Sequence, residues 1–239
     1  MTQISPSHDR TVAFLKNSTF FGSLSEAALG TLVRKGHTKR YAKGGIICHR
    51  GDPGDSMMII VSGRVKIANT RVDGRETVLS FLGVGDLAGE IAVLDGKERT
   101  ANVVALEETE VFVIYSRDVL PVLMAYPAGM LEVIQVLCDK LRAATSIIED
   151  STSEMDARGA SGLLRLAQQH GVKTRDGVRI DLKVSQTDLG NYLGLSRANV
   201  SRLLTHLKEC GVIKMDGANI VIADEAHLVA ASEQATGKS

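Results

Sequence analysis

The segment that decides the fold is GEIAVLDGKERT, residues 89–100. A carboxylate, Glu90, precedes an apolar run, the chain turns at Asp95–Gly96, and it returns to an arginine beside a hydroxyl, Arg99 and Thr100. Because Asp-Gly favours a tight turn, we expect Glu90 and Arg99 to face one site and to pair weakly with each other. The guanidinium offers a fork of charged donors that suits phosphate oxygens. The segment therefore predicts a site for a small phosphate ester.

Glycine is dense around this segment. Ten of the 23 glycines lie between Tyr41 and Thr100, and they separate short runs rich in Val and Ile. Many short strands at regular spacing indicate a small antiparallel barrel or roll. The predicted strands include 58–61, 64–67 and 109–114, with a hairpin turn at Asp73–Gly74 and a helix start at 23–29.

The pattern changes after Pro127. Apolar residues recur at alternating steps of four and three, which is typical of a coiled-coil seam. We therefore predict a long helix over 128–155 that pairs with a second copy in a parallel homodimer. The alternative is an amphipathic helix packed on its own domain. The seam consists of Met130, Ile134, Leu137, Leu141, Ala144 and Ile148.

A second motif is VSQTDLGNYLGLSRANVSR, residues 184–202. Ser185 and Ser196 are predicted to cap two short helices that are joined by a tight turn at Gly194. The first residues of the second helix would meet base edges, and the start of the first helix would meet phosphates. The candidate DNA contacts are Ser185, Gln186, Thr187, Ser196, Arg197, Ala198, Asn199, Ser201 and Arg202, with Lys214 as a further phosphate contact.

The segments around this motif complete a second domain. Asp156 is predicted to cap a helix after a hinge at 157–159, and 161–170 is predicted to be helical. Two Val/Ile runs between Val212 and Ala223 flank Asp216–Gly217, which predicts a β-hairpin wing. Residues 157–239 carry 11 Lys and Arg against 8 Asp and Glu, a mildly basic balance that suits phosphates.

Composition excludes other classes. Aromatic residues make up 4% of the chain and Trp is absent, which argues against stacking on single-stranded nucleic acid. The three cysteines lie far apart and the six histidines have no metal spacing, so neither a metal nor a disulfide framework is expected. Without paired carboxylates or an activated nucleophile, we expect no enzyme. With a polar stretch at 1–10 and no long apolar run, we expect a cytoplasmic protein without membrane contact.

Together, the two motifs resemble the cyclic-AMP receptor protein/FNR family of bacterial transcription regulators. The resemblance implies an α+β fold with a cyclic-nucleotide-binding β-roll (1–127), a dimerisation helix (128–155) and a winged helix-turn-helix (156–239). It also implies a homodimer that binds a palindromic operator on double-stranded DNA in response to a cyclic nucleotide, with no further cofactor. RNA polymerase is a candidate partner. The implied ligand residues are Gly89, Glu90, Ile91, Arg99, Thr100, Thr145 and Ser146.

Several alternatives stay open. Cyclic AMP is favoured by family habit, while hydroxyls such as those of Thr145 and Ser146 suit cyclic GMP equally well. A regulator of the same fold that responds to another effector, or a nucleotide-binding scaffold without DNA activity, is the alternative function. The iron–sulfur branch needs a cysteine cluster that the sequence lacks, and a haem branch has only His37 and His49 as loose candidates. Ala198 departs from the glutamate that the resemblance leads one to expect beside Arg197.

Overall fold

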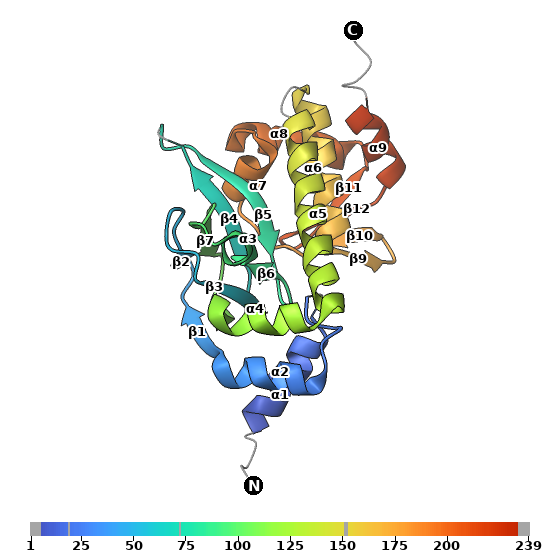
Figure 1. Ribbon diagram of the computed structural model, residues 1–239. Coiled ribbons are helices and arrows are strands. Elements are labelled where there is room, and N and C mark those ends of the chain that lie inside the picture. Colours follow the sequence, from blue (N-terminus) through green and yellow to red (C-terminus); the bar gives the residue numbers. More distant parts are fainter. Residues whose placement is uncertain (1–5, 19, 72, 151–152, 234–239) are drawn as a thin grey trace. The chain divides into compact units, whose positions relative to one another are not determined.

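The computed structural model describes residues 6–18, 20–71, 73–150 and 153–233 (Figure 1). By internal contacts the chain divides into two compact units, Met1–Lys140 and Leu141–Ser239. The first unit contains α1 (Pro6–Lys16), α2 (Glu26–Lys35), β1 (His37–Tyr41), β2 (Ile46–Cys48), β3 (Ser56–Ser62), β4 (Val65–Thr70), β5 (Glu76–Leu82), β6 (Leu87–Ala88), α3 (Glu90–Asp95), β7 (Asn102–Ala105), β8 (Thr109–Tyr115) and α4 (Ser116–Ala125). Helix α5 (Pro127–Asp150) runs from the first unit into the second. The second unit continues with α6 (Met155–His170), β9 (Gly171–Thr174), β10 (Gly177–Ile180), α7 (Gln186–Leu193), α8 (Arg197–Glu209), β11 (Ile213–Asp216), β12 (Asn219–Ile222) and α9 (Glu225–Glu233).

The predicted roll is confirmed. Two four-stranded sheets with the strand orders β1-β8-β3-β6 and β2-β7-β4-β5 form it, and all of their pairs are antiparallel. Asp73 and Gly74 lie in the turn between β4 and β5, as predicted. Alternation along β3 builds two cores: Met58 and Ile60 lie in the core between the sheets, whereas Met57 and Ile59 pack with the helices. Because β3 is buried on both faces, it holds the side chains along it in fixed positions.

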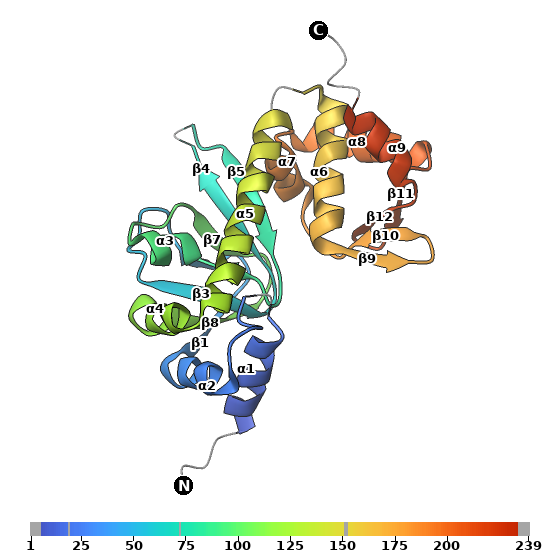
Figure 2. The same ribbon diagram turned by 45° about the vertical axis from the view of Figure 1, so that its right-hand side comes forward.

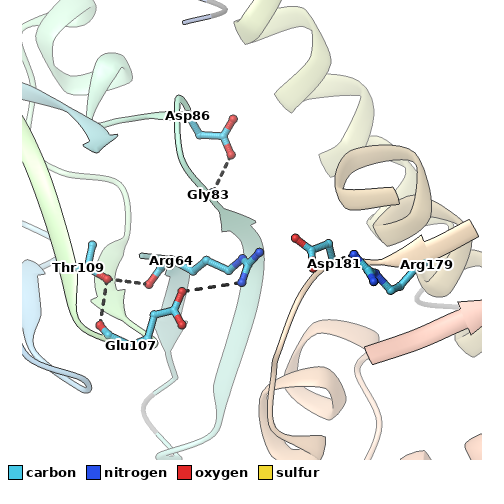
Figure 3. A network of polar contacts seen from close by, with 7 residues as sticks. All are labelled: Arg64, Gly83, Asp86, Glu107, Thr109, Arg179 and Asp181. Carbon is cyan, nitrogen blue, oxygen red and sulfur yellow. Dashed lines mark hydrogen bonds and ion pairs between the residues drawn. The ribbon is translucent and has the colours of Figure 1, made fainter. Parts of the chain in front are cut away.

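Polar contacts close the turns of the roll (Figure 3). The hydroxyl of Thr109 lies 3.1 Å from the carbonyl oxygen of Arg64 and 3.0 Å from that of Glu107. Asp86 accepts the backbone N–H of Gly83 at 2.8 Å. These contacts satisfy backbone groups that the turns leave outside the strand ladders.

Helices cover one face of the roll. Helix α2 begins at the N-cap Ser25, whose hydroxyl accepts from the N–H of Ala28, and it packs against α4 (Figure 1). Among the described residues no single helix is long and apolar enough to cross a bilayer. Only α4 and α5 taken together pass such a test of length and composition, and they are bent by 114° at the break between them.

The residues of the seam predicted on α5 lie in two different environments. Met130 and Leu137 pack against the core of their own unit, which is the alternative that an amphipathic pattern allows. Ile134, Leu141, Ala144 and Ile148 of the same predicted seam are exposed instead. The outward stripe contains Leu131, Ile134, Leu141 and Ile148, which are 51–70% exposed. We call these four residues the α5 stripe.

The second unit carries the predicted helix pair and wing. A four-stranded sheet, β11-β12-β10-β9, contains the hairpin predicted around Asp216–Gly217. Two strands that the sequence did not predict, β9 and β10, extend it. Helix α9 packs along α6 (Figure 2).

The hinge predicted at 157–159 is wrong. These residues lie inside α6, and the N-cap is Glu154 rather than Asp156. Gly159 serves packing: a Cβ there would lie 2.2 Å from Cδ2 of Leu203. Helix α5 ends at Asp150, so the predicted helix over 128–155 is shorter at its C-terminal end, where residues 151–152 lie outside the described part of the chain.

Candidate anion site and nucleic-acid interface

Arg99 is almost completely buried, with 6% of its surface exposed. Its Nη1 donates to the carbonyl oxygen of Gly89 at 3.0 Å and its Nη2 to the hydroxyl of Ser56 at 2.9 Å. Its Nε is buried and has no acceptor among the described residues. The guanidinium is therefore held through its two terminal nitrogens, while its buried Nε–H makes no hydrogen bond to the described residues.

Gly89 is required by this geometry. It has a φ of +83°, a conformation that glycine adopts at no steric cost. A Cβ at this position would lie 2.4 Å from Nη1 of Arg99. Any other residue would therefore both strain the backbone and displace the guanidinium.

The expected pair between Glu90 and Arg99 is wrong. Glu90 is the first residue of α3, 1% exposed, and its Oε1 accepts from Nζ of Lys140 on α5 at 2.7 Å. Lys140 also donates to the carbonyl oxygen of Leu87 at 3.2 Å. Arg99 takes neutral acceptors instead, and no carboxylate of the described residues lies within ion-pair distance of it. Its positive charge is therefore available to an anion.

The other predicted ligand residues lie in varied surroundings. Ile91, on α3, is 37% exposed, and Thr100 is exposed two residues before the start of β7. On α5, the Thr145 hydroxyl donates to the carbonyl oxygen of Leu141 at 3.0 Å, and the Ser146 hydroxyl accepts from Nη1 of Arg165 at 3.1 Å. Both hydroxyls are thus already engaged within the second unit.

Sequence reasoning missed two residues of the anion site, Ser56 and Lys140. Ser56 and Lys140 carry no motif, because a serine at a strand start and a lysine on an amphipathic helix are common on solvated surfaces. Cys48, on β2, is buried. Burial raises the pKa of its thiol, and the positive charge of Arg99 acts in the opposite direction. Among the residues described, no group of three His, Cys, Asp or Glu side chains could hold a metal ion.

The helix pair of the second unit has the predicted caps. Ser185 accepts from the N–H of Asp188 at 3.0 Å and donates to its carboxylate at 2.6 Å, and Ser196 accepts from the N–H of Asn199 at 3.2 Å. Gly194 closes the turn with a φ of +66°. These contacts fix the start of both helices, where DNA contacts are predicted.

The exposed face of α8 carries the candidate base-reading residues. Arg197, Ala198, Ser201 and Arg202 are exposed, and Asn199 is half-buried. Asn199 accepts a hydrogen bond from Nη2 of Arg202, so these two side chains are linked on one face. Within the described part of the chain, Arg197 makes no ion pair. Gln186 and Thr187 are exposed in the first turn of α7.

The wing carries paired charges. Nζ of Lys214 on β11 lies 3.2 Å from Oδ1 of Asp176 in the β9–β10 turn. Arg179 on β10 lies 3.5 Å from a carboxylate oxygen of Asp216 and 3.9 Å from one of Asp181, the last pair being drawn in Figure 3. Lys214, which is predicted to contact a DNA phosphate, is therefore paired with Asp176 within the wing.

Comparisons with known proteins assign both units. A cyclic nucleotide-binding domain matches residues 38–126, and a Crp-like helix-turn-helix domain matches residues 157–231. The chain belongs to the CRP/FNR family of transcription regulators. The family consists of regulators rather than enzymes, as the sequence predicted. The fold is likewise confirmed as α+β, with a β-rich nucleotide-binding domain, a long helix and a helix-turn-helix with a small sheet.

The chain is similar to several known proteins, of which three are described. The "CRP-like cAMP-activated global transcriptional regulator" of Mycobacterium tuberculosis is 28% identical over 216 residues, covering 90% of this chain and 96% of that protein. FixK2 from Bradyrhizobium japonicum aligns with a TM-score of 0.73 at 22% identity, over 82% of this chain and 96% of that chain. The "c-di-GMP Responsive Global Regulator CLP" of Xanthomonas campestris aligns with a TM-score of 0.67 at 21% identity, over 83% of this chain and 99% of that chain. The two solved structures support the fold alone.

Proposed function

We propose that this CRP/FNR regulator is gated by a cyclic nucleotide, cyclic AMP before cyclic GMP, and then binds a palindromic operator as a homodimer in the cytoplasm. The carrying observation is the buried guanidinium of Arg99, which has one N–H without an acceptor and no acidic partner among the described residues. A buried cation without a counterion is costly, so a bound anion would relieve that cost. The cyclic phosphodiester supplies one negative charge.

The proposed ligand contacts follow from this arrangement. Arg99 neutralises the phosphate, with Thr100 and Gly89 beside it, and Glu90 accepts the ribose 2′-hydroxyl. Since a carboxylate oxygen accepts more than one hydrogen bond, Glu90 can hold Lys140 and a ribose hydroxyl together. Ile91 packs near the sugar. Thr145 and Ser146 remain predictions for base recognition, which rest on the family resemblance.

The proposed DNA contacts use the exposed faces described above. Arg197 donates in bidentate fashion to guanine, and Ala198 lies against a thymine methyl group. Asn199, Ser201 and Arg202 meet further bases or phosphates. The phosphate backbone of the DNA is contacted by Ser185, Gln186, Thr187, Ser196 and Lys214. Dimerisation through the α5 stripe would present two such surfaces to the two half-sites of an operator.

Gel retardation with and without each nucleotide, over a series of salt concentrations, tests the whole proposal. We expect retardation of an operator fragment to require cyclic AMP or cyclic GMP and to weaken steeply with salt. Calorimetric titration of the protein with each nucleotide identifies the effector. Heat without retardation would support the scaffold alternative, and retardation that neither nucleotide changes would support a regulator with another effector.

A further inference from the structure

Two neutral oxygens hold the guanidinium of Arg99. The carbonyl oxygen of Gly89 accepts from Nη1, and the hydroxyl of Ser56 accepts from Nη2 at 2.9 Å. Ser56 is the first residue of β3 and is 9% exposed. Because β3 is packed on both faces, the position of this hydroxyl is set by the core of the roll rather than by a mobile loop.

The direction of the contact between Ser56 and Arg99 is fixed by chemistry. A guanidinium only donates, so the Ser56 hydroxyl must accept with a lone pair and send its own proton elsewhere. That proton goes to Oδ1 of Asp55, which lies 3.2 Å from the hydroxyl oxygen. The chain of donors therefore runs from Arg99 through Ser56 to Asp55. The carboxylate of Asp55 reaches the guanidinium only through this hydroxyl.

From this chain we propose that Ser56 is the positioning residue of the anion site, and that it must be a hydroxyl rather than an acid. The proposal rests on the proposed function and deepens it. A hydroxyl fixes Nη2 without neutralising the guanidinium, so Nε–H stays oriented and Arg99 stays available to the phosphate. An aspartate at the same place would fix the arginine equally well but would neutralise it. An alanine would leave the charge of Arg99 intact, but its guanidinium would no longer be held in one orientation.

Three substitutions in the full-length protein separate these effects. Calorimetric titration with cyclic AMP and cyclic GMP measures nucleotide affinity, and a thermal midpoint verifies folding. We expect Ser56→Thr to bind within about threefold of the unmodified protein, because it keeps the hydroxyl. Ser56→Ala is expected to bind roughly tenfold to a hundredfold more weakly, the range for losing a hydrogen bond to a charged group. Ser56→Asp is expected to lose at least as much nucleotide affinity as Ser56→Ala. If Ser56→Ala does not fold, Ser56→Cys replaces it, because cysteine is close to serine in size and its sulfur is only a weak acceptor.

A double-mutant cycle with Arg99→Gln distinguishes positioning from a general role in the strand. If Ser56 acts through Arg99, Ser56→Ala has no further effect on nucleotide affinity in the Arg99→Gln background. The same loss in both backgrounds, or unchanged affinity in Ser56→Asp, would overturn the proposal.

A second readout does not depend on the effector. The Nε–H of a buried arginine exchanges slowly with water and gives a resolved proton–nitrogen resonance, which Arg99→Gln would identify by its loss. We expect this resonance to persist in Ser56→Thr and to broaden or vanish in Ser56→Ala. If the unmodified protein binds neither nucleotide, the proposed effector is wrong, while this resonance still decides the positioning role. An unchanged resonance in Ser56→Ala would reject that role.

Discussion

Lys140 of α5 donates to Oε1 of Glu90 at 2.7 Å, and the carboxylate that it meets is 1% exposed. A side chain of the long helix thus supplies the counterion for the first residue of α3. We expect Lys140→Met to lower the free energy of unfolding by about 1–3 kcal/mol, because it leaves a buried carboxylate uncompensated. Urea denaturation measures the loss.

Lys97→Met is the matched control for this prediction, since the Lys97 side chain is 80% exposed and its partner Asp95 is 3.8 Å away. It should change stability by less than about 0.5 kcal/mol. Adding Glu90→Gln to Lys140→Met should recover much of the loss. A Lys140→Met protein with an unshifted urea midpoint would show that the ion pair contributes nothing.

Arg165 joins three helices of the second unit. Its Nη1 contacts Asp150 and Ser146 of α5, and its guanidinium lies 5.7 Å from the centre of the Tyr192 ring on α7. Burial lowers the pKa of Arg165, but hydrogen bonds to Tyr192 and Asp150 raise it overall, so the group stays charged. We expect Arg165→Met to destabilise the protein by about 2–4 kcal/mol, because Asp150 loses its cation.

Thermal unfolding followed by circular dichroism checks the Arg165 prediction. Arg175→Met removes an exposed arginine and should leave the midpoint nearly unchanged. Since buried pairs are screened little by salt, the loss in Arg165→Met should persist at high ionic strength. A loss that disappears in high salt would contradict the assignment of this pair as buried.

The α5 stripe predicts where dimers form. Leu141 is 68% exposed, so Leu141→Asp should leave the fold intact and weaken dimerisation by about 100-fold or more, as a buried charge would at an interface. Sedimentation equilibrium measures the association. Met124→Asp, at an equally exposed apolar residue of α4, should leave the dimer unaffected.

Leu137→Asp separates the two possible seams of α5. Leu137 packs against the core of its own unit, so its replacement by Asp should destabilise the monomer rather than the dimer alone. A Leu137→Asp protein that folds normally but stays monomeric would show that Leu137 belongs to the dimer interface, as the seam predicted from the sequence requires.

Ala198 sets the reading preference beside Arg197. Its methyl group can meet thymine but cannot accept from the amino group of cytosine, whereas a glutamate accepts that hydrogen bond. We expect Ala198→Glu to shift preference at the adjoining base pair toward G·C by about 1–3 kcal/mol. Selection of binding sites from random DNA checks this shift. Recovery of one identical site with both proteins would exclude a role for residue 198 in reading that base pair.

Removing the acidic partner of Lys214 in the wing is expected to increase DNA affinity. Asp176 holds the ammonium group of Lys214 at 3.2 Å and therefore competes with phosphate for it. We expect Asp176→Asn to strengthen binding to a generic duplex about two- to fivefold, the size of an exposed ion pair. Fluorescence anisotropy over a salt series measures the affinity. Glu225→Gln removes the same charge outside the wing sheet, and an equal gain there would indicate a net-charge effect instead.

The sequence predicted the order of the elements well and the contacts of the site less well. Periodicity placed the strands of the roll, and the Ser185 and Ser196 caps placed α7 and α8, because such signals act within a few residues. The heptad pattern of α5 did not show that Met130 and Leu137 pack against the core of their own unit, because that contact depends on tertiary structure. The sequence also predicted a hinge at Gly159, whereas Leu203, which packs on that glycine, is distant in sequence.

The amino-acid sequence by itself determined the two-domain plan, the segment 89–100 and the helix pair around Arg197, because caps, turns and alternation are local properties of the chain. Only the tertiary structure decided the partners of Glu90 and Arg99. Lys140 and Ser56 come from distant elements, and which charge meets which is decided by packing rather than by spacing along the chain. That packing leaves the Nε of Arg99 buried, with no acceptor in the part of the chain that the structure describes.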